Sequence, residues 1–146
     1  MNETSGASWH DDCVIVARQA QAIAGLIMES PSGGTVSIGG AGENVELLTD
    51  PVDYPARYVI GGACQSEIIP ERYVTLWGSH VWLQVAALLV RASTPYVGWW
   101  QSDGHVFVDS LTFSNDLIRA QELATNRGEL AIWDSVDGCE IGAVFT

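Results

Sequence analysis

The last third of the chain most restricts what it can fold into, because its structural signals follow one another without a gap. Two alternating apolar segments flank Asp103-Gly104, and an Asp-Gly pair between such segments is typical of a β-hairpin. Ser114 is placed to cap a helix that Gly128 would end, and Asp137-Gly138 predicts a second turn. The expected elements are strands over 96–101 and 105–109, a helix over 115–126, and strands over 130–133 and 141–145. This order predicts a C-terminal ββαββ unit.

The first two thirds add two helices and further short strands. Asp11 or Asp12 can cap a helix running to about Met28, whose apolar residues recur on one face, and we expect residues 1–10 to be disordered. Residues 72–77 fit another strand. A second helix, from Ser79 or His80 to Ala92, is apolar nearly all round, which predicts a buried central helix.

These elements together predict a single α+β domain over residues 1–146. An antiparallel sheet would pack against the buried central helix and the N-terminal helix, with the ββαββ unit completing the fold. A chain of 146 residues is long enough to bury a core of its own, without a metal or a disulfide.

The C-terminal segment also carries a resemblance. The run from Trp99 to Ile141 holds a hairpin, Phe107-Val108-Asp109, a helix, the heptapeptide 128–134 and a final turn and strand. It resembles the ends of small uncharacterised proteins of actinobacteria and of their mobile elements. The resemblance implies a bacterial, phage or plasmid origin, and it assigns neither an activity nor a site residue.

The charge of the chain is strongly one-signed. Eighteen Asp and Glu face six Arg and no Lys, for a formal net charge of −12. Such a chain is repelled by nucleic-acid phosphates and by anionic membranes, so we expect neither as a direct partner. The acids gather in residues 1–56 and 101–146, with eight in each segment, while the middle of the chain holds two.

A one-signed field is what electrostatic steering toward a basic partner requires. Carboxylates on a rigid scaffold accept bidentate hydrogen bonds from Arg much as phosphates do. Seven acids of the last third fall at turns or exposed helix positions. Trp99 and Trp100 must point to opposite faces of their strand, so one of them could be an exposed anchor. The expected partner-binding residues are Asp103, Asp116, Glu122, Glu129, Asp134, Asp137, Glu140, Trp99 and Trp100.

A catalytic alternative uses Cys64, which follows an expected strand, as a nucleophile with His80 or His105 as its base. Its sequence context lacks the second Gly of a nucleophile elbow, and no helix follows to lower the pKa of the thiol. His10 with Asp11 and Asp12, or His105 with Asp103 and Asp109, lacks the spacing of a metal site. We therefore expect no metal, no cofactor and no catalytic residue, with the enzyme question left open.

The three cysteines are odd in number and widely spaced, which favours free thiols in the cytoplasm. The leading hypothesis is a non-enzymatic acidic protein that docks on a basic, nucleic-acid-binding protein surface and inhibits it. A phage or plasmid antagonist of a defence system, of the anti-CRISPR or anti-restriction kind, is its concrete form. The alternatives are a small cytosolic Cys/His hydrolase or transferase, and a host housekeeping protein whose acidity is incidental. A homodimer is an open alternative for the assembly.

Overall fold

A computed structural model describes residues 3–39 and 44–142, with side chains described from residue 13 onward. The strands form two antiparallel sheets. The larger sheet has five strands in the order β2-β1-β5-β6-β4, and the smaller has four in the order β7-β3-β8-β9. In the larger sheet they are β1 (Gly33–Ile38), β2 (Val45–Leu47), β4 (Glu67–Pro70), β5 (Tyr96–Ser102) and β6 (His105–Ser110). In the smaller they are β3 (Tyr58–Ile60), β7 (Thr112–Ser114), β8 (Ala131–Asp134) and β9 (Cys139–Gly142).

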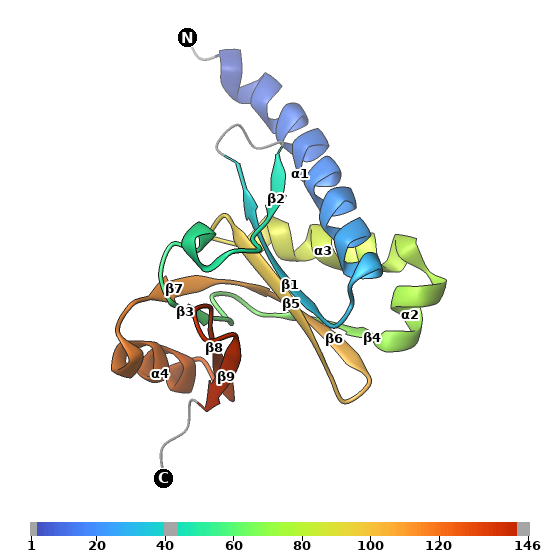
Figure 1. The fold of residues 1–146 in the computed structure, drawn as a ribbon. Helices are drawn as coiled ribbons and strands as arrows, with labels where there is room; N and C mark the ends of the chain where they lie inside the picture. The colour runs from blue at the N-terminus through green and yellow to red at the C-terminus, as the bar shows by residue number, and fades with distance from the viewer. Residues whose placement is uncertain (1–2, 40–43, 143–146) are drawn as a thin grey trace.

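Four α-helices and one 3-10 turn complete the described part of the chain. Figure 1 shows α1, α2 and α3 on one side of the larger sheet, while α4 lies with the smaller sheet at the other side of the molecule. The helices are α1 (Glu3–Glu29), α2 (Glu71–Leu76), α3 (Gly78–Arg91) and α4 (Leu117–Asn126), and the 3-10 turn is η1 (Pro51–Asp53). No helix in this part of the chain is long and apolar enough to cross a bilayer. The α+β class expected from the sequence is confirmed.

The main core lies between α1, α3 and one face of the larger sheet. Buried residues of α1 follow the helical repeat, and so do those of α3, because only one side of each helix meets the sheet. Trp99 is only 2% exposed, and its indole N–H donates to the Ser30 carbonyl at 2.8 Å. The helix contributions are Ala20, Ile23, Ala24 and Ile27 from α1 and Val81, Val85 and Leu88 from α3.

A second, smaller core lies between α4 and one face of the smaller sheet. Ala120 and Ala124 of α4 pack on Tyr58, Ile60 and Ile132. The small alanine side chains let the helix approach the sheet closely. The chain passes from the larger to the smaller sheet at Leu111, where β6 ends and β7 begins.

The free faces of the two sheets look toward each other. Gly98, Trp100, Phe107 and Asp109 share the face of the larger sheet opposite to Trp99, because side chains alternate along a strand. Trp133 lies opposite Val59 on the free face of the smaller sheet. The opposite orientations expected for Trp99 and Trp100 are therefore observed.

Several expectations about the elements need correction. The first helix begins at Glu3, so residues 3–10, expected to be disordered, are helical, and no Pro interrupts the segment. Residues 72–77 are not a strand, because α2 covers most of them. Asp116, not Ser114, caps α4 by accepting a hydrogen bond from the Arg119 N–H.

The central helix is buried on one side only. Leu83 and Val90 of α3 are 57% and 77% exposed, because the sheet and α1 cover the opposite side. The strands also divide between two sheets where one was expected. The hairpin of the ββαββ unit joins the larger sheet, while its last two strands join the smaller.

Candidate functional site

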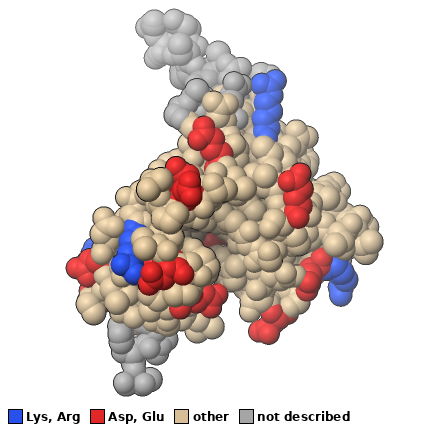
Figure 2. All heavy atoms as spheres, viewed as in Figure 1, with Lys and Arg blue, Asp and Glu red and all other residues tan. Residues whose placement is uncertain are grey.

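A cleft of about 860 Å³ separates the free faces of the two sheets. Figure 2 shows a hollow near the middle of the face in view. Facing sheets normally interdigitate about 10 Å apart, and a volume of this size is within the usual range of ligand pockets. The two sheets thus leave room for a ligand where a sandwich would have a packed core.

Aromatic rings supply much of the wall. Trp100 and Phe107 stack with their ring planes 11° apart and their centroids 5.8 Å apart, on the side of the larger sheet. Trp133 faces them from β8 and is 39% exposed, and Tyr54 adds a fourth ring. Ile68, 53% exposed, extends the apolar wall along β4. The wall therefore offers partly exposed π-faces to whatever enters.

The only charged residues among the described residues lining the cleft are Glu129 and Glu140, and no Arg, Lys or His lines it. Glu140 lies opposite Trp133 in the pairing of β8 with β9, so a carboxylate and an indole are neighbours at the cleft. Glu129 stands in the short segment between α4 and β8, after Gly128, whose φ of 75° ends the helix in the left-handed conformation. The cleft is acidic and aromatic.

A second carboxyl group lies directly behind Glu129. Asp109, on β6, is fully buried, and its Oδ1 accepts a hydrogen bond from the Ser66 hydroxyl. Its Oδ2 has no partner among the N–H and O–H donors of the described residues. A Cβ on Gly61 would overlap Asp109 Oδ2 and come within 2.8 Å of Glu129 Oε1. The missing side chain at Gly61 thus leaves the space in which the two carboxyls meet.

Asp109 and Glu129 lie close enough to share one hydrogen bond, and such a bond requires a proton between the two carboxyl groups. Burial, the charge of Asp109 and this hydrogen bond raise the pKa of Glu129 to about 7. Burial also raises the pKa of Asp109, against the hydrogen bonds from Ser66 and the Gly62 backbone. Two adjacent carboxylates cannot both ionise easily, so the pair holds one proton near neutral pH.

Arg127 lies near this pair without neutralising it. Its Nη1 donates to the Gly61 carbonyl at 3.0 Å and to the Thr112 hydroxyl at 2.8 Å. Within the described part of the chain, no ion pair joins Arg127 to Asp109 or Glu129, so its charge acts on them only through space. The guanidinium instead ties β3 to β7 at the corner between the sheets.

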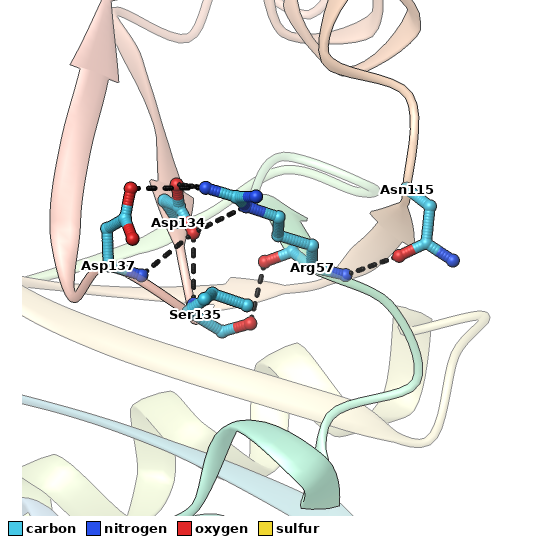
Figure 3. A network of polar contacts seen from close by, with 6 residues as sticks. Arg57, Asn115, Asp134, Ser135 and Asp137 are labelled. Carbon is cyan, nitrogen blue, oxygen red and sulfur yellow. Dashed lines mark hydrogen bonds and ion pairs between the residues drawn. The ribbon is translucent and has the colours of Figure 1, made fainter.

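Two other acids, Asp134 and Asp137, form ion pairs with Arg57 that stabilise the fold. Figure 3 shows the Arg57 guanidinium reaching Asp134 and Asp137 on the same side, while Ser135 and Asn115 are hydrogen-bonded to the Arg57 backbone. Asp134 is 2% exposed and accepts from Arg57 Nε at 3.0 Å and Nη2 at 2.8 Å. The hydrogen bond with Arg57 is the main cause that lowers the pKa of Asp134 to about 2. This network fastens the turn between β8 and β9 to β3.

The structure thus places the nine expected partner-binding residues in three settings. Glu129, Glu140 and Trp100 line the cleft. Trp99 also borders the cleft, but its side chain and that of Asp134 are buried, so neither presents a surface to a partner. Asp103, Asp116, Glu122 and Asp137 are exposed away from the cleft lining. Asp103 is at the hairpin turn with a φ of 50°, Asp116 caps α4 and Asp137 pairs with Arg57.

The exposed acids do not form one patch. They lie on or beside α1, β2, η1, α2, the β5–β6 turn, α4, the β8–β9 turn and β9, and Figure 2 shows red atoms dispersed over the face in view. What distinguishes the cleft from the outer surface is that two acids share one lining with several aromatic rings.

The alternative catalytic residues each have other contacts. Cys64 Sγ lies 3.8 Å from its neighbour's carbonyl, at Gln65, and packs against the main core. His80 packs edge-on against Tyr73, with ring centroids 4.8 Å apart, and His105 Nδ1 lies 2.9 Å from the Asp103 carbonyl. No hydrogen bond in the described part of the chain joins either imidazole to the thiol. The described residues also hold no cluster of three or more His, Cys, Asp or Glu suited to a metal ion.

The sequence interpretation missed the pairing of Asp109 with Glu129 and the exposed ring of Trp133. One signal was present: Asp109 ends an apolar strand segment whose other residues predict burial, and a buried acid needs a partner. Comparison of the chain with protein-family models, with curated proteins and with solved structures finds no match.

Proposed function

We propose that this is a non-enzymatic binding protein whose cleft receives positively charged side chains of a protein partner. The observation that carries the proposal is the composition of the cleft lining. Two carboxyl residues and several aromatic rings meet there, with no cationic side chain among the described lining residues. Anionic ligands such as phosphates would find no counter-charge in this cleft.

Aromatic faces and carboxylates together form a favourable site for a cation. An Arg or Lys head over an indole gains about 0.5–2 kcal/mol, more when water is excluded. Trp133 and Glu140 are cross-strand neighbours, so one entering cation can contact both. The apolar stem of the same side chain would lie along Ile68 and Phe107.

The partner we propose is a basic surface of a nucleic-acid-binding protein, which this protein would block. Arg-rich surfaces that bind phosphates also bind carboxylates, so occupation by this chain would compete with nucleic acid. The net charge of −12 would speed the encounter, even though the exposed acids are spread over several elements. A phage or plasmid antagonist of a bacterial defence protein, acting in the cytoplasm, is the concrete form of this proposal.

The proposal predicts which acids matter for binding. Glu140→Gln should weaken binding of a fluorescein-labelled tetra-arginine peptide about tenfold, equivalent to about 1.4 kcal/mol. Glu122→Gln removes the same charge from the exposed surface of α4 and should change the affinity less than about twofold, because surface charges are well screened. Fluorescence anisotropy at 50 and 300 mM salt measures both variants, and a tetra-glutamate peptide is the negative probe.

Equal losses in the two variants would refute the cleft as the binding site. Tight peptide binding that is indifferent to salt would refute the electrostatic mechanism. Absence of any binding to the arginine peptide would favour the alternative in which the acidity only aids solubility.

A further inference from the structure

We infer that the inner end of the cleft is a guanidinium subsite, where the head of a bound arginine replaces the proton that Glu129 and Asp109 share. This inference rests on the proposed function and deepens it. It specifies arginine as the preferred side chain and predicts that binding releases a proton.

The geometry places the pair where the cleft wall meets the buried interior, and this place is what we call the inner end of the cleft. Glu129 and Ser66 line the cleft, and Ser66 donates to the fully buried Asp109 behind them. Gly61, also in the lining, adjoins an oxygen of each carboxyl group. An entering cation therefore meets Glu129 first, with the charge of Asp109 immediately beyond.

The hydrogen bonds of Asp109 indicate that a proton occupies the guanidinium subsite when no arginine is bound. Its Oδ2 is buried and receives no hydrogen bond from an N–H or O–H donor of the described residues, although the other oxygen is held by Ser66. A buried carboxylate oxygen without a donor is costly, and a protonated Glu129 supplies the missing donor. The proton between the two groups is therefore a replaceable positive charge.

Arginine suits this subsite better than lysine. Its planar guanidinium can stack between ring faces and present two N–H groups to one carboxylate, whereas an ammonium is a compact, strongly hydrated charge. Trp100 and Phe107 on one wall and Trp133 on the other supply the rings. The charged groups acting on Glu129 are Asp109 from β6 and Arg127 from the same segment between α4 and β8, and β9 adds Glu140 to the same cleft.

Binding of one arginine side chain is balanced by the release of one proton. Glu129 passes from carboxylic acid to carboxylate, the proton leaves to solvent, and the arginine keeps its own protons because its pKa exceeds 12. The raised pKa of Glu129 places this exchange near neutral pH. Affinity should then rise by up to about tenfold per pH unit below pH 7 and level off above it.

The test is a titration of the full chain with acetylated, amidated tetra-arginine and tetra-lysine peptides between pH 5.5 and 8.5. Calorimetry in phosphate and in imidazole, which both accept protons at pH 6 and differ in heat of ionisation, counts the protons released. We expect close to one proton per arginine peptide at pH 6, almost none at pH 8.5, and weaker binding of the lysine peptide throughout. Both peptides keep their charge over this range, so the pH response belongs to the protein.

Two variants separate the subsite from the rest of the cleft. Glu129→Gln has the shape of the protonated residue and cannot release a proton, so it should bind more weakly above pH 7 with a flat pH profile. Glu140→Gln should bind more weakly and keep the pH response. Wild-type affinity that is independent of pH, or a response that survives in Glu129→Gln, would overturn the subsite while leaving the proposed function in place. No binding of either peptide at any pH would overturn the proposed function itself.

Discussion

At the scale of the residue, the inner end of the cleft depends on the absence of a side chain at Gly61. Gly61→Ala would push a methyl group against Asp109 Oδ2 and close to Glu129 Oε1. Overpacking of this kind costs about 1–3 kcal/mol of unfolding free energy. Urea unfolding at pH 6, where the pair shares its proton, should show this loss.

Gly142→Ala is the matched control, because a Cβ at Gly142 has no heavy atom within 4 Å. Both glycines lie in or beside strands of the smaller sheet, so the backbone effect of the exchange is similar. If the two variants lost the same stability, the close approach of the carboxyls to Gly61 would not be the cause.

At the scale of the element, α3 shows how an apolar helix can be buried on one side and exposed on the other. Leu88 is fully buried against the sheet, whereas Leu83 is 57% exposed. Leu88→Ala should lower the unfolding free energy by about 2–5 kcal/mol, because it leaves a cavity in the core. Leu83→Ala should change it by less than about 0.5 kcal/mol, as for an ordinary surface position. Comparable losses in chemical denaturation would mean that the outer side of α3 is covered in solution.

Elements with local signals were the ones that the sequence could predict. The Asp103-Gly104 turn takes positive φ at both residues, as an Asp-Gly hairpin requires, and the buried side of α1 follows its apolar repeat. The apolar composition of α3 could not reveal its exposed side, because composition does not say how many neighbours a helix has. The helical state of residues 71–76 was equally hidden, since Tyr73, Val74 and Thr75 are residues typical of strands.

At the scale of the whole molecule, the candidate site exists only because two sheets meet. Asp109 belongs to the larger sheet and Glu129 to the segment that enters the smaller one, so no spacing in the sequence connects them. The sequence could name acids and tryptophans as candidates for binding, and Glu129, Glu140 and Trp100 of the cleft were among them. It could not separate these from Asp134, which the fold commits to Arg57.

The shared proton also predicts how the stability of the folded chain depends on pH. Glutamate in an unfolded chain has a pKa near 4.5, while that of Glu129 in the folded protein is about 7. Between these values the folded protein holds a proton that the unfolded chain has lost, so the unfolding free energy falls as the pH rises. Below about pH 4.5 this stabilisation is fully present, and above about pH 7 it has gone. Because Glu129 is only partly buried, we expect a loss on the order of 1–2 kcal/mol.

Urea unfolding of the wild type and of Glu129→Gln at pH 5, 6, 7 and 8 measures this effect. The amide introduced by Glu129→Gln stays neutral and can still donate to Asp109, so the variant should lack this decline and be the more stable protein at pH 8. Glu140→Gln, which removes a carboxylate from the same cleft, should keep the wild-type decline, and this separates the buried pair from the general field of the acids. If the unfolding free energies of the wild type and of Glu129→Gln changed with pH in parallel over the whole range, the two carboxyls would share no proton in the folded chain. The guanidinium subsite, which depends on that shared proton, would then be refuted.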